Sequence, residues 1–143
     1  MNGITVALSE DIRSKLGSEA VKEYPSECCG ILLGKANEGI TTVTEVIPLA
    51  NSISGDRDRK HYSIDPVKLY ETEREYRETG TELIGFYHSH PDAPAIPSFE
   101  DVEGMIPGMI YLIAEVRTGK YTGTRGYIKG LESDDLQELP ITT

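Results

Sequence analysis

Cysteine is scarce in this sequence, and its placement excludes one class of protein. The only two cysteines are the neighbours Cys28 and Cys29. Adjacent cysteines cannot cross-link distant parts of a chain, so the sequence is not that of a disulfide-stabilised secreted scaffold, and free thiols fit a reducing compartment. A chain of 143 residues is long enough to bury a core without such cross-links.

Long apolar runs are also missing. No stretch approaches the ~20 apolar residues of a membrane-spanning helix, and the first residues lack the basic and apolar regions of a signal peptide. The composition, 38% hydrophobic and 27% charged, is that of a soluble globular protein. We therefore expect no membrane association and a cytoplasmic location.

Basic residues are few. Lysine and arginine number 14 against 24 acidic residues, which gives a formal net charge of −10. This balance disfavours binding to nucleic acid and to anionic lipid, and it helps to keep a protein soluble. The sequence also has no internal repeat, low-complexity tract or linker, so residues 1–143 are expected to form a single domain.

Hydrophobic periodicity predicts more strands than helices. Strands are expected at 4–8, 29–34, 41–47, 61–64, 109–116 and 121–128, and the tail should add an edge strand at 138–141. A first helix, capped by Ser9 and ended by Pro25, should turn Ile12, Leu16 and Ala20 inward.

A second helix is expected at 66–79, with an apolar side formed by Val67, Leu69, Tyr70 and Tyr76. The polar residues 51–60 before it should form an exposed loop. Together, these elements predict a mixed α/β domain of the α+β type, with a curved, largely antiparallel sheet flanked by helices.

Chemistry concentrates in residues 85–101, which hold two of the three histidines. His88 and His90 follow an apolar run and should project from one face of a strand, with α-carbons ~6.6 Å apart, so that both could bind one metal ion. Prolines stiffen the connection to a helix start capped by Ser98, which would bring back Asp101 as a third ligand. Alone, Ser-x-x-Asp is an ordinary capping box and His-x-His an ordinary pair.

Together, the spacing His-x-His, seven residues, Ser, two residues, Asp resembles the signature of the JAMM (MPN+) metalloprotease family, of the Mov34/MPN type. The family also has an essential glutamate, in a Pro-x-Glu-x-Cys-Gly context at the end of the first helix, and Glu27 matches it. The resemblance runs from the first helix to the strand after the motif. It implies the cytidine-deaminase-like MPN/JAMM fold, a curved sheet between helices.

The resemblance also implies a role for each residue. His88, His90 and Asp101 would hold one Zn²⁺ per chain, which lowers the pKa of bound water to about 7. Glu27 would act as the general base and return the proton to the leaving amine. Ser98 would donate a hydrogen bond to the oxyanion of the tetrahedral intermediate.

The family cleaves amide or isopeptide bonds after the carboxyl-terminal glycine of ubiquitin or ubiquitin-like proteins, and this short chain is similar to its bacterial branch. Some members of that branch act on sulfur-carrier proteins, for example by releasing cysteine from the carrier. A zinc metallopeptidase acting on such a protein is therefore expected. The sequence leaves open the identity of the carrier, the role of residues 51–60 and the oligomeric state, for which a homodimer is one possibility.

Three alternatives stay open at this point. A cysteine hydrolase would use Cys28 or Cys29, although free cysteine is commonly buried packing. A non-catalytic MPN-type scaffold would bind partner proteins, but such scaffolds lack the ligand set that is complete here. A nucleic-acid-associated relative with a similar motif is disfavoured by the acidic charge and by the context of Glu27.

Overall fold

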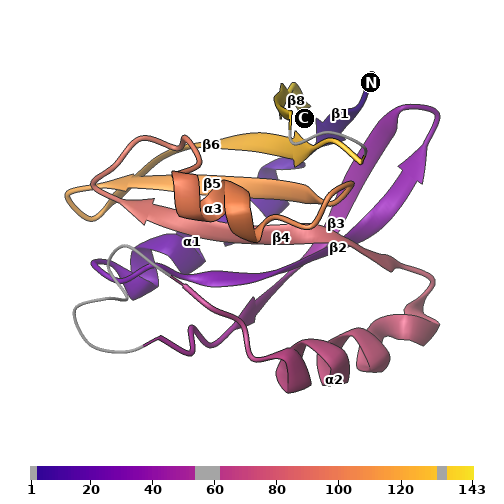
Figure 1. Ribbon diagram of the computed structural model, residues 1–143, viewed down its shortest axis with the longest axis horizontal. Coiled ribbons are helices and arrows are strands. Elements are labelled where there is room, and N and C mark those ends of the chain that lie inside the picture. The colour runs from indigo at the N-terminus through magenta and orange to yellow at the C-terminus, as the bar shows by residue number, and fades with distance from the viewer. Residues whose placement is uncertain (1–2, 54–61, 132–134) are drawn as a thin grey trace.

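The computed structural model describes residues 3–53, 62–131 and 135–143, and these form an eight-stranded sheet with helices on both faces (Figure 1). The strands are β1 (Thr5–Ala7), β2 (Cys29–Asn37), β3 (Ile40–Leu49), β4 (Glu82–Pro91), β5 (Ile110–Arg117), β6 (Lys120–Lys129), β7 (Leu136–Leu139) and β8 (Ile141–Thr142). The helices are α1 (Glu10–Glu23), α2 (Pro66–Tyr76) and α3 (Phe99–Gly104), and α2 continues into the 3₁₀ turn η2 (Arg77–Thr79).

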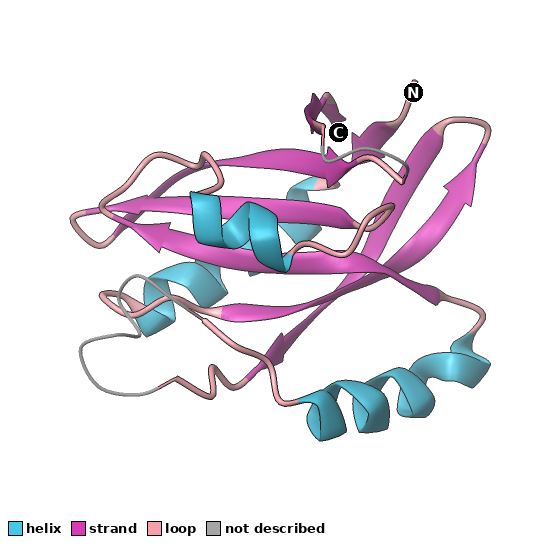
Figure 2. Ribbon diagram, in the orientation of Figure 1, coloured by secondary structure: helices cyan, strands magenta, loops and turns pink. Residues whose placement is uncertain are grey.

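The sheet is curved and mixed (Figure 2), in the order β7-β6-β5-β4-β2-β3-β1-β8. The pairs β2–β3, β2–β4, β5–β6 and β6–β7 are antiparallel, while β1–β3, β1–β8 and β4–β5 are parallel. Both short terminal strands lie together at one edge of the sheet. The expected α+β architecture is confirmed.

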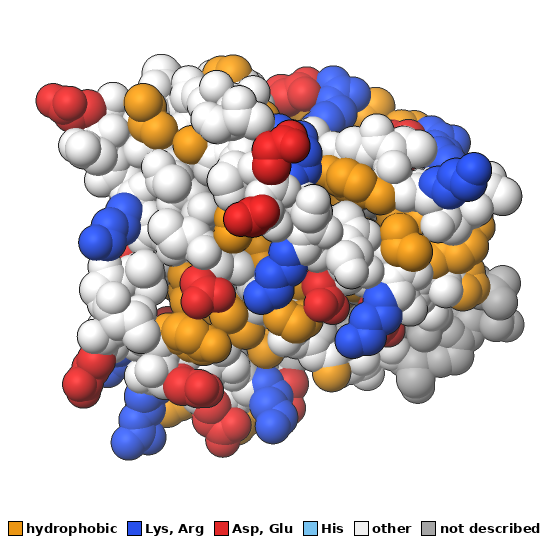
Figure 3. All heavy atoms as spheres, turned by 180° about the vertical axis from the view of Figure 1, so that it is seen from behind, with side chains coloured by type: hydrophobic (Ala, Val, Ile, Leu, Met, Phe, Trp, Pro, Cys, Tyr) orange, Lys and Arg blue, Asp and Glu red, His pale blue; other side chains and the backbone are white. Residues whose placement is uncertain are grey.

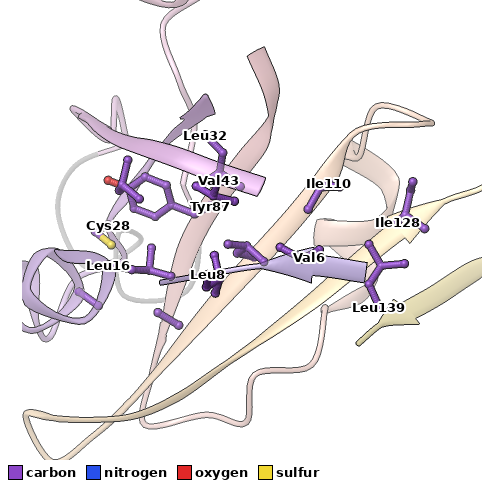
Figure 4. Close-up of a cluster of buried hydrophobic side chains, with 14 of the residues drawn as sticks. Val6, Leu8, Leu16, Cys28, Leu32, Val43, Tyr87, Ile110, Ile128 and Leu139 are labelled. Carbon is purple, nitrogen blue, oxygen red and sulfur yellow. The ribbon is translucent and has the colours of Figure 1, made fainter. Parts of the chain in front are cut away.

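Side chains alternate between two cores because successive strand residues point to opposite faces. Leu16 of α1 packs with Leu32 and Tyr87 on one face (Figure 4). Phe86 and Tyr111 belong to the cluster on the other face. The histidines of β4 share the face of Phe86, so the metal-ligand candidates lie on the side away from α1.

The first helix forms as predicted. Ser9 caps it by accepting a hydrogen bond from the backbone N–H of Ile12 at 3.2 Å, and acidic residues occupy the first turn. Leu16 and Ala20 are buried, and Ile12 packs partly buried against the same cluster. The helix stops just before Pro25, as expected from a ring that cannot continue it.

Two details of the predicted elements are wrong, and the first is the inward face of α2. Val67 and Tyr70 of α2 are 61% and 58% exposed, whereas Leu69 and Tyr76 pack against the sheet. The inward stripe of α2 is thus narrower than its apolar composition suggests. Charged side chains of both signs gather over α2, at the lower left of Figure 3.

The second wrong detail is the strand expected at 61–64. Residue 61 lies outside the described residues, and residues 62–64 form no ladder. Ser63 is instead held by isolated contacts, since its N–H donates to Asn51 Oδ1 and its carbonyl accepts from Ser52. Residues 54–61, which include most of the loop predicted at 51–60, lie outside the described residues. Among the described helices, none has the length and hydrophobicity needed to cross a bilayer.

Candidate metal centre

The antiparallel pairing of β2 with β4 brings together residues about sixty positions apart. Cys29 pairs with His88. One step further, Ser89 donates its N–H to the carbonyl of Cys28 at 3.1 Å, and its buried Oγ accepts the Cys28 N–H at 2.8 Å. Glu27 therefore enters the site beside the end of β4.

The connection after β4 returns the chain to the same place. Its central residue, Ala95, is buried and fixed at both backbone groups: the N–H donates to Glu115 Oε1 at 3.0 Å, and the carbonyl accepts from Tyr127 Oη at 2.7 Å. The helix α3 begins directly afterwards at its cap, Ser98. The stiff return that the prolines predict is therefore present, and it delivers Asp101 to the histidines.

Three candidate ligand atoms converge at this point. Asp101 Oδ2 lies 3.0 Å from His90 Nε2 and 3.2 Å from His88 Nε2. Ligand atoms of the three residues all lie within 4.8 Å of one another. Two atoms bound tetrahedrally at about 2.0–2.1 Å from one ion would be about 3.3 Å apart. The cluster has the size of a zinc site with three protein ligands.

The hydrogen bonds of the imidazoles also fit a metal. His90 Nδ1 lies 2.7 Å from the Pro94 carbonyl, which can only accept, so Nδ1 carries a proton. Its Nε2, 3.0 Å from Asp101 Oδ2, is the nitrogen that could bind an ion. His88 is fully buried, its Nδ1 has no hydrogen-bond partner among the described residues, and its Nε2 has only the Asp101 carboxylate as a neighbour, at 3.2 Å. The ring of Tyr62 stacks on His88 at 4.5 Å between centroids. A buried imidazole without a hydrogen bond is costly unless a ligand satisfies it.

Burial and charge shift the pKa values of the three cluster residues in different directions. Burial alone would raise the pKa of Asp101, but the neighbouring imidazoles and the backbone N–H of Ser98 hold it well below its ordinary value. Burial lowers the pKa of His88, which keeps that ring neutral. For His90, burial lowers the pKa, but the contacts with Asp101 and the Pro94 carbonyl outweigh it and leave the pKa raised. Because metals bind carboxylates and neutral imidazoles, an ion would displace a proton from His90.

Glu27 is the second buried group that lacks a partner. It is 4% exposed, and its Oε1 makes no hydrogen bond within the described residues. Burial raises its pKa to about 8, with the charges of His90 and Asp101 acting on it in opposite directions. Its backbone, by contrast, is held: the carbonyl accepts from Asn51 Nδ2 at 3.3 Å. Glu27 Oε1 thus stays without a hydrogen bond, while the carboxyl is close enough to His90 and Asp101 for their charges to act on it.

Ser98 combines two interactions with Asp101. Its Oγ accepts the N–H of Asp101 at 3.0 Å, and its own N–H donates to Asp101 Oδ2 at 2.9 Å, which completes the capping box. A hydroxyl that accepts still has a hydrogen to donate. The exposed Ser98 can therefore orient a ligand and donate to a substrate oxygen.

The two cysteines are poor candidates for nucleophiles. Both are buried, and burial raises the pKa of Cys28 to about 11 and that of Cys29 to about 12. A thiol nucleophile needs a lowered pKa. The structure thus argues against the cysteine hydrolase alternative.

Sequence reasoning missed two residues at the site. Tyr62 stacks on His88, and Asn51 joins the backbone of Glu27 to Ile53 and Ser63, whose N–H groups each donate to Asn51 Oδ1 at 3.0 Å. Neither residue has a spacing relation to the motif. Only the folded chain brings them there.

Comparison with known proteins agrees with this geometry. Residues 9–125 match the family described as prokaryotic homologs of the JAB domain. The chain belongs to this prokaryotic JAB family. The resemblance inferred from the motif is thereby confirmed, and the same motif includes the three residues that could bind a metal.

Relatives in the prokaryotic JAB family carry names of conjugate-cleaving enzymes. The chain is 32% identical over 118 residues to a desampylase of Haloferax volcanii, covering 79% of this chain and 82% of that one. It is 28% identical to a probable TtuB-protein conjugate cleaving protease of Thermus thermophilus (71% and 64% covered) and 25% identical to a CysO-cysteine peptidase of Mycobacterium bovis (85% and 81%).

The fold is also similar to that of a solved structure. The solution structure of protein DSY2949 from Desulfitobacterium hafniense matches with a TM-score of 0.79 at 26% identity, covering 96% of this chain and 91% of that one. Sequence and structure thus agree on a JAB-like domain, and the named relatives support a hydrolase.

Proposed function

We propose that this protein is a zinc-dependent peptidase or isopeptidase that hydrolyses the amide bond after the carboxyl-terminal glycine of a ubiquitin-like or sulfur-carrier protein. The observation that carries the proposal is the convergence of His88, His90 and Asp101 beside the buried, unpartnered carboxyl of Glu27. The names of the relatives, which are desampylase, conjugate cleaving protease and CysO-cysteine peptidase, support the same substrate class.

His88, His90 and Asp101 would hold the ion. Bound zinc would supply a Lewis acid that acidifies water and polarises the scissile carbonyl. The Pro94 carbonyl fixes the tautomer of His90, and the capping box fixes the carboxylate of Asp101, so these ligands are oriented before any ion arrives.

Glu27 would carry the proton. Its carboxylate accepts a proton from the attacking water and then delivers it to the nitrogen of the breaking amide, so that the amine can leave. A pKa raised towards the working pH suits a group that must both accept and donate. The Asn51 contact to the Glu27 carbonyl keeps the carboxyl at the cluster.

Ser98 would stabilise the substrate oxygen. Its remaining hydroxyl hydrogen can donate to the carbonyl oxygen as negative charge develops there. Removal of one such donor typically lowers kcat by about 10²–10³.

Metal content and activity, measured on the same preparations, test these roles. We expect about one zinc per wild-type chain, loss of zinc in Asp101→Ala, and an inactive Glu27→Gln that retains its zinc. Ser98→Ala should retain zinc with reduced kcat. If this variant lost its zinc, the role of Ser98 would be to cap α3 and not to donate to the substrate oxygen. The substrate is a carrier protein ending in Gly-Gly, linked through an amide to an amine. A wild type that binds no metal and cleaves no adduct would make the chain an interaction module.

A further inference from the structure

Two pockets adjoin the metal centre. The first, of about 350 Å³, is lined by Asp101 and Tyr62, and the second, of about 390 Å³, is lined by Glu27. They meet at Ile53, which lines both. A substrate that crosses the site would therefore place the two halves of its scissile amide in different pockets.

Proton transfer decides which half enters which pocket. Under the proposed function, Glu27 delivers a proton to the leaving amine and must lie within hydrogen-bond reach of it. Its Oε1 is buried and makes no hydrogen bond within the described residues. The pocket that Glu27 lines, called here the leaving-group pocket, is thus the place for the amine.

The walls of the leaving-group pocket differ in character. The end of β3 and the residue after it supply apolar surface from Pro48, Leu49 and Ala50, which suits an aliphatic chain. The last turns of α1 supply two carboxylates, Glu19 and Glu23, against one ammonium, Lys22.

The charges of Glu19 and Glu23 reach other residues that line the pocket. Burial is the main cause that raises the pKa of Cys28, which lines this pocket, and the charges of Glu19 and Glu23 raise it further. Because they lie four positions apart on α1, the two side chains share one helix face. Even without Glu27, the pocket has an excess of negative charge.

We propose that the leaving-group pocket binds a lysine side chain from a basic stretch of a target protein, so that the enzyme prefers isopeptide adducts to adducts of a free amino acid. This inference rests on the proposed function. The lysine stem packs on the apolar wall, and neighbouring cations face Glu19 and Glu23. A free amino acid would bring its own carboxylate into the same pocket. Lys22 offsets only one of the charges of Glu19 and Glu23, so that carboxylate would be repelled.

Three adducts of one Gly-Gly carrier test the inference: an isopeptide to the lysine of a basic peptide, the same isopeptide to an acidic peptide of equal length, and an amide to cysteine. We expect zinc-loaded wild type to cleave the basic adduct with a kcat/KM about tenfold above the other two at low salt, and the ratio should fall as salt is added. In the double variant Glu19→Gln/Glu23→Gln, the ratio between basic and acidic adducts should approach one.

A matched control removes the same charge elsewhere. Glu71 and Glu75 are exposed, also lie four positions apart, and belong to α2. Glu71→Gln/Glu75→Gln should keep the wild-type ratio. This result would show that the preference depends on charge in the pocket and not on the net charge of the protein.

Equal cleavage of all three adducts, a preference for the cysteine adduct, or an unchanged ratio in Glu19→Gln/Glu23→Gln would overturn the inference and leave the proposed function standing. Failure of zinc-loaded wild type to cleave any adduct would overturn the proposed function itself.

Discussion

Glu27 is a residue at which folding and the proposed chemistry make opposite demands. A carboxyl buried without a hydrogen bond is unfavourable for the folded state, because its charged form loses solvation. The proposed reaction needs the same carboxyl free of partners. The loss of stability from burying Glu27 is therefore a consequence of its proposed role as general base.

This cost should depend on pH in the metal-free protein. The pKa of Glu27 is about 8 when folded, against an ordinary value of 4.5. Below the lower value both states are protonated and nothing is lost. As pH rises from there towards the folded pKa, the unfolded chain ionises first, so the free energy of unfolding falls, and it levels off above the folded pKa.

Glu27→Gln removes this dependence. The variant should gain stability relative to wild type as pH rises, by up to a few kcal/mol at about pH 8 and by little at about pH 4. Urea unfolding of both proteins in chelator, across that range, measures the difference. A difference that does not change with pH would contradict the raised pKa.

Asn51 should matter for both stability and activity. Asn51→Ala removes the partner of the Glu27 carbonyl and of the Ile53 and Ser63 N–H groups. We expect a loss of about 1–3 kcal/mol and a fall in kcat larger than the change in KM. Denaturant unfolding and steady-state kinetics measure these effects. Asn37→Ala, at an exposed strand end, is the control and should stay within about 0.5 kcal/mol of wild type.

At the scale of residues, the sequence predicted the convergence of His88, His90 and Asp101 because local geometry determines it. Period-two alternation puts His88 and His90 on one face, and prolines with a capping box return Asp101. Tyr62 and Asn51 could not be predicted, since their contacts depend on how separate loops pack.

Among the elements, β4 and β5 leave no room for a side chain at Gly85. A Cβ added there would lie 1.9 Å from the carbonyl oxygen of Ile110 in the neighbouring strand. The parallel pairing of these strands begins at that position, and β4 carries both histidines.

Gly85→Ala should therefore destabilise the protein by more than about 3 kcal/mol, because the obstacle is backbone that cannot rotate away. Thermal unfolding measures the loss. Gly104→Ala, where a Cβ meets nothing within 4 Å, should be neutral or slightly stabilising. Equal melting temperatures for the two variants would contradict the close approach.

Element types were more predictable than their faces. The α1 stripe was predicted because its capping residue and four-residue spacing agree. In α2, the apolar Val67 and Tyr70 point to solvent because the helix contacts the sheet along a narrow line through Leu69 and Tyr76. Composition alone cannot show the width of a contact.

For the whole molecule, residues 136–142 add a strand at each edge of the sheet. β7 pairs with β6 at one edge, and β8 pairs with β1 at the other. Val6 donates its N–H to the carbonyl of Pro140 at 2.9 Å, and Leu8 donates to that of Thr142 at 2.8 Å. The sequence predicted a single edge strand here, because nothing local shows that Pro140 separates strands at opposite edges.

Deleting residues 140–143 should lower the free energy of unfolding by about 2–4 kcal/mol, through lost hydrogen bonds and the lost packing of Ile141. It should also promote self-association through the uncovered edge of β1. Denaturant titration and light scattering measure the two effects. Deleting Thr143 alone should change neither stability nor self-association. If the protein without residues 140–143 kept the wild-type free energy of unfolding, β8 would be dispensable.

The arrangement of β7 and β8 also bears on biosynthesis. A ribosome makes β1 and β6 before the strands that cover them, so both sheet edges stay open while residues 136–142 remain in the exit tunnel. The nascent chain can already form β2, β4 and the histidine pair at that stage, but its unpaired edges are open to other chains. Pairing of β7 with β6 and of β8 with β1 thus ends the period in which these two strands are open to misassembly.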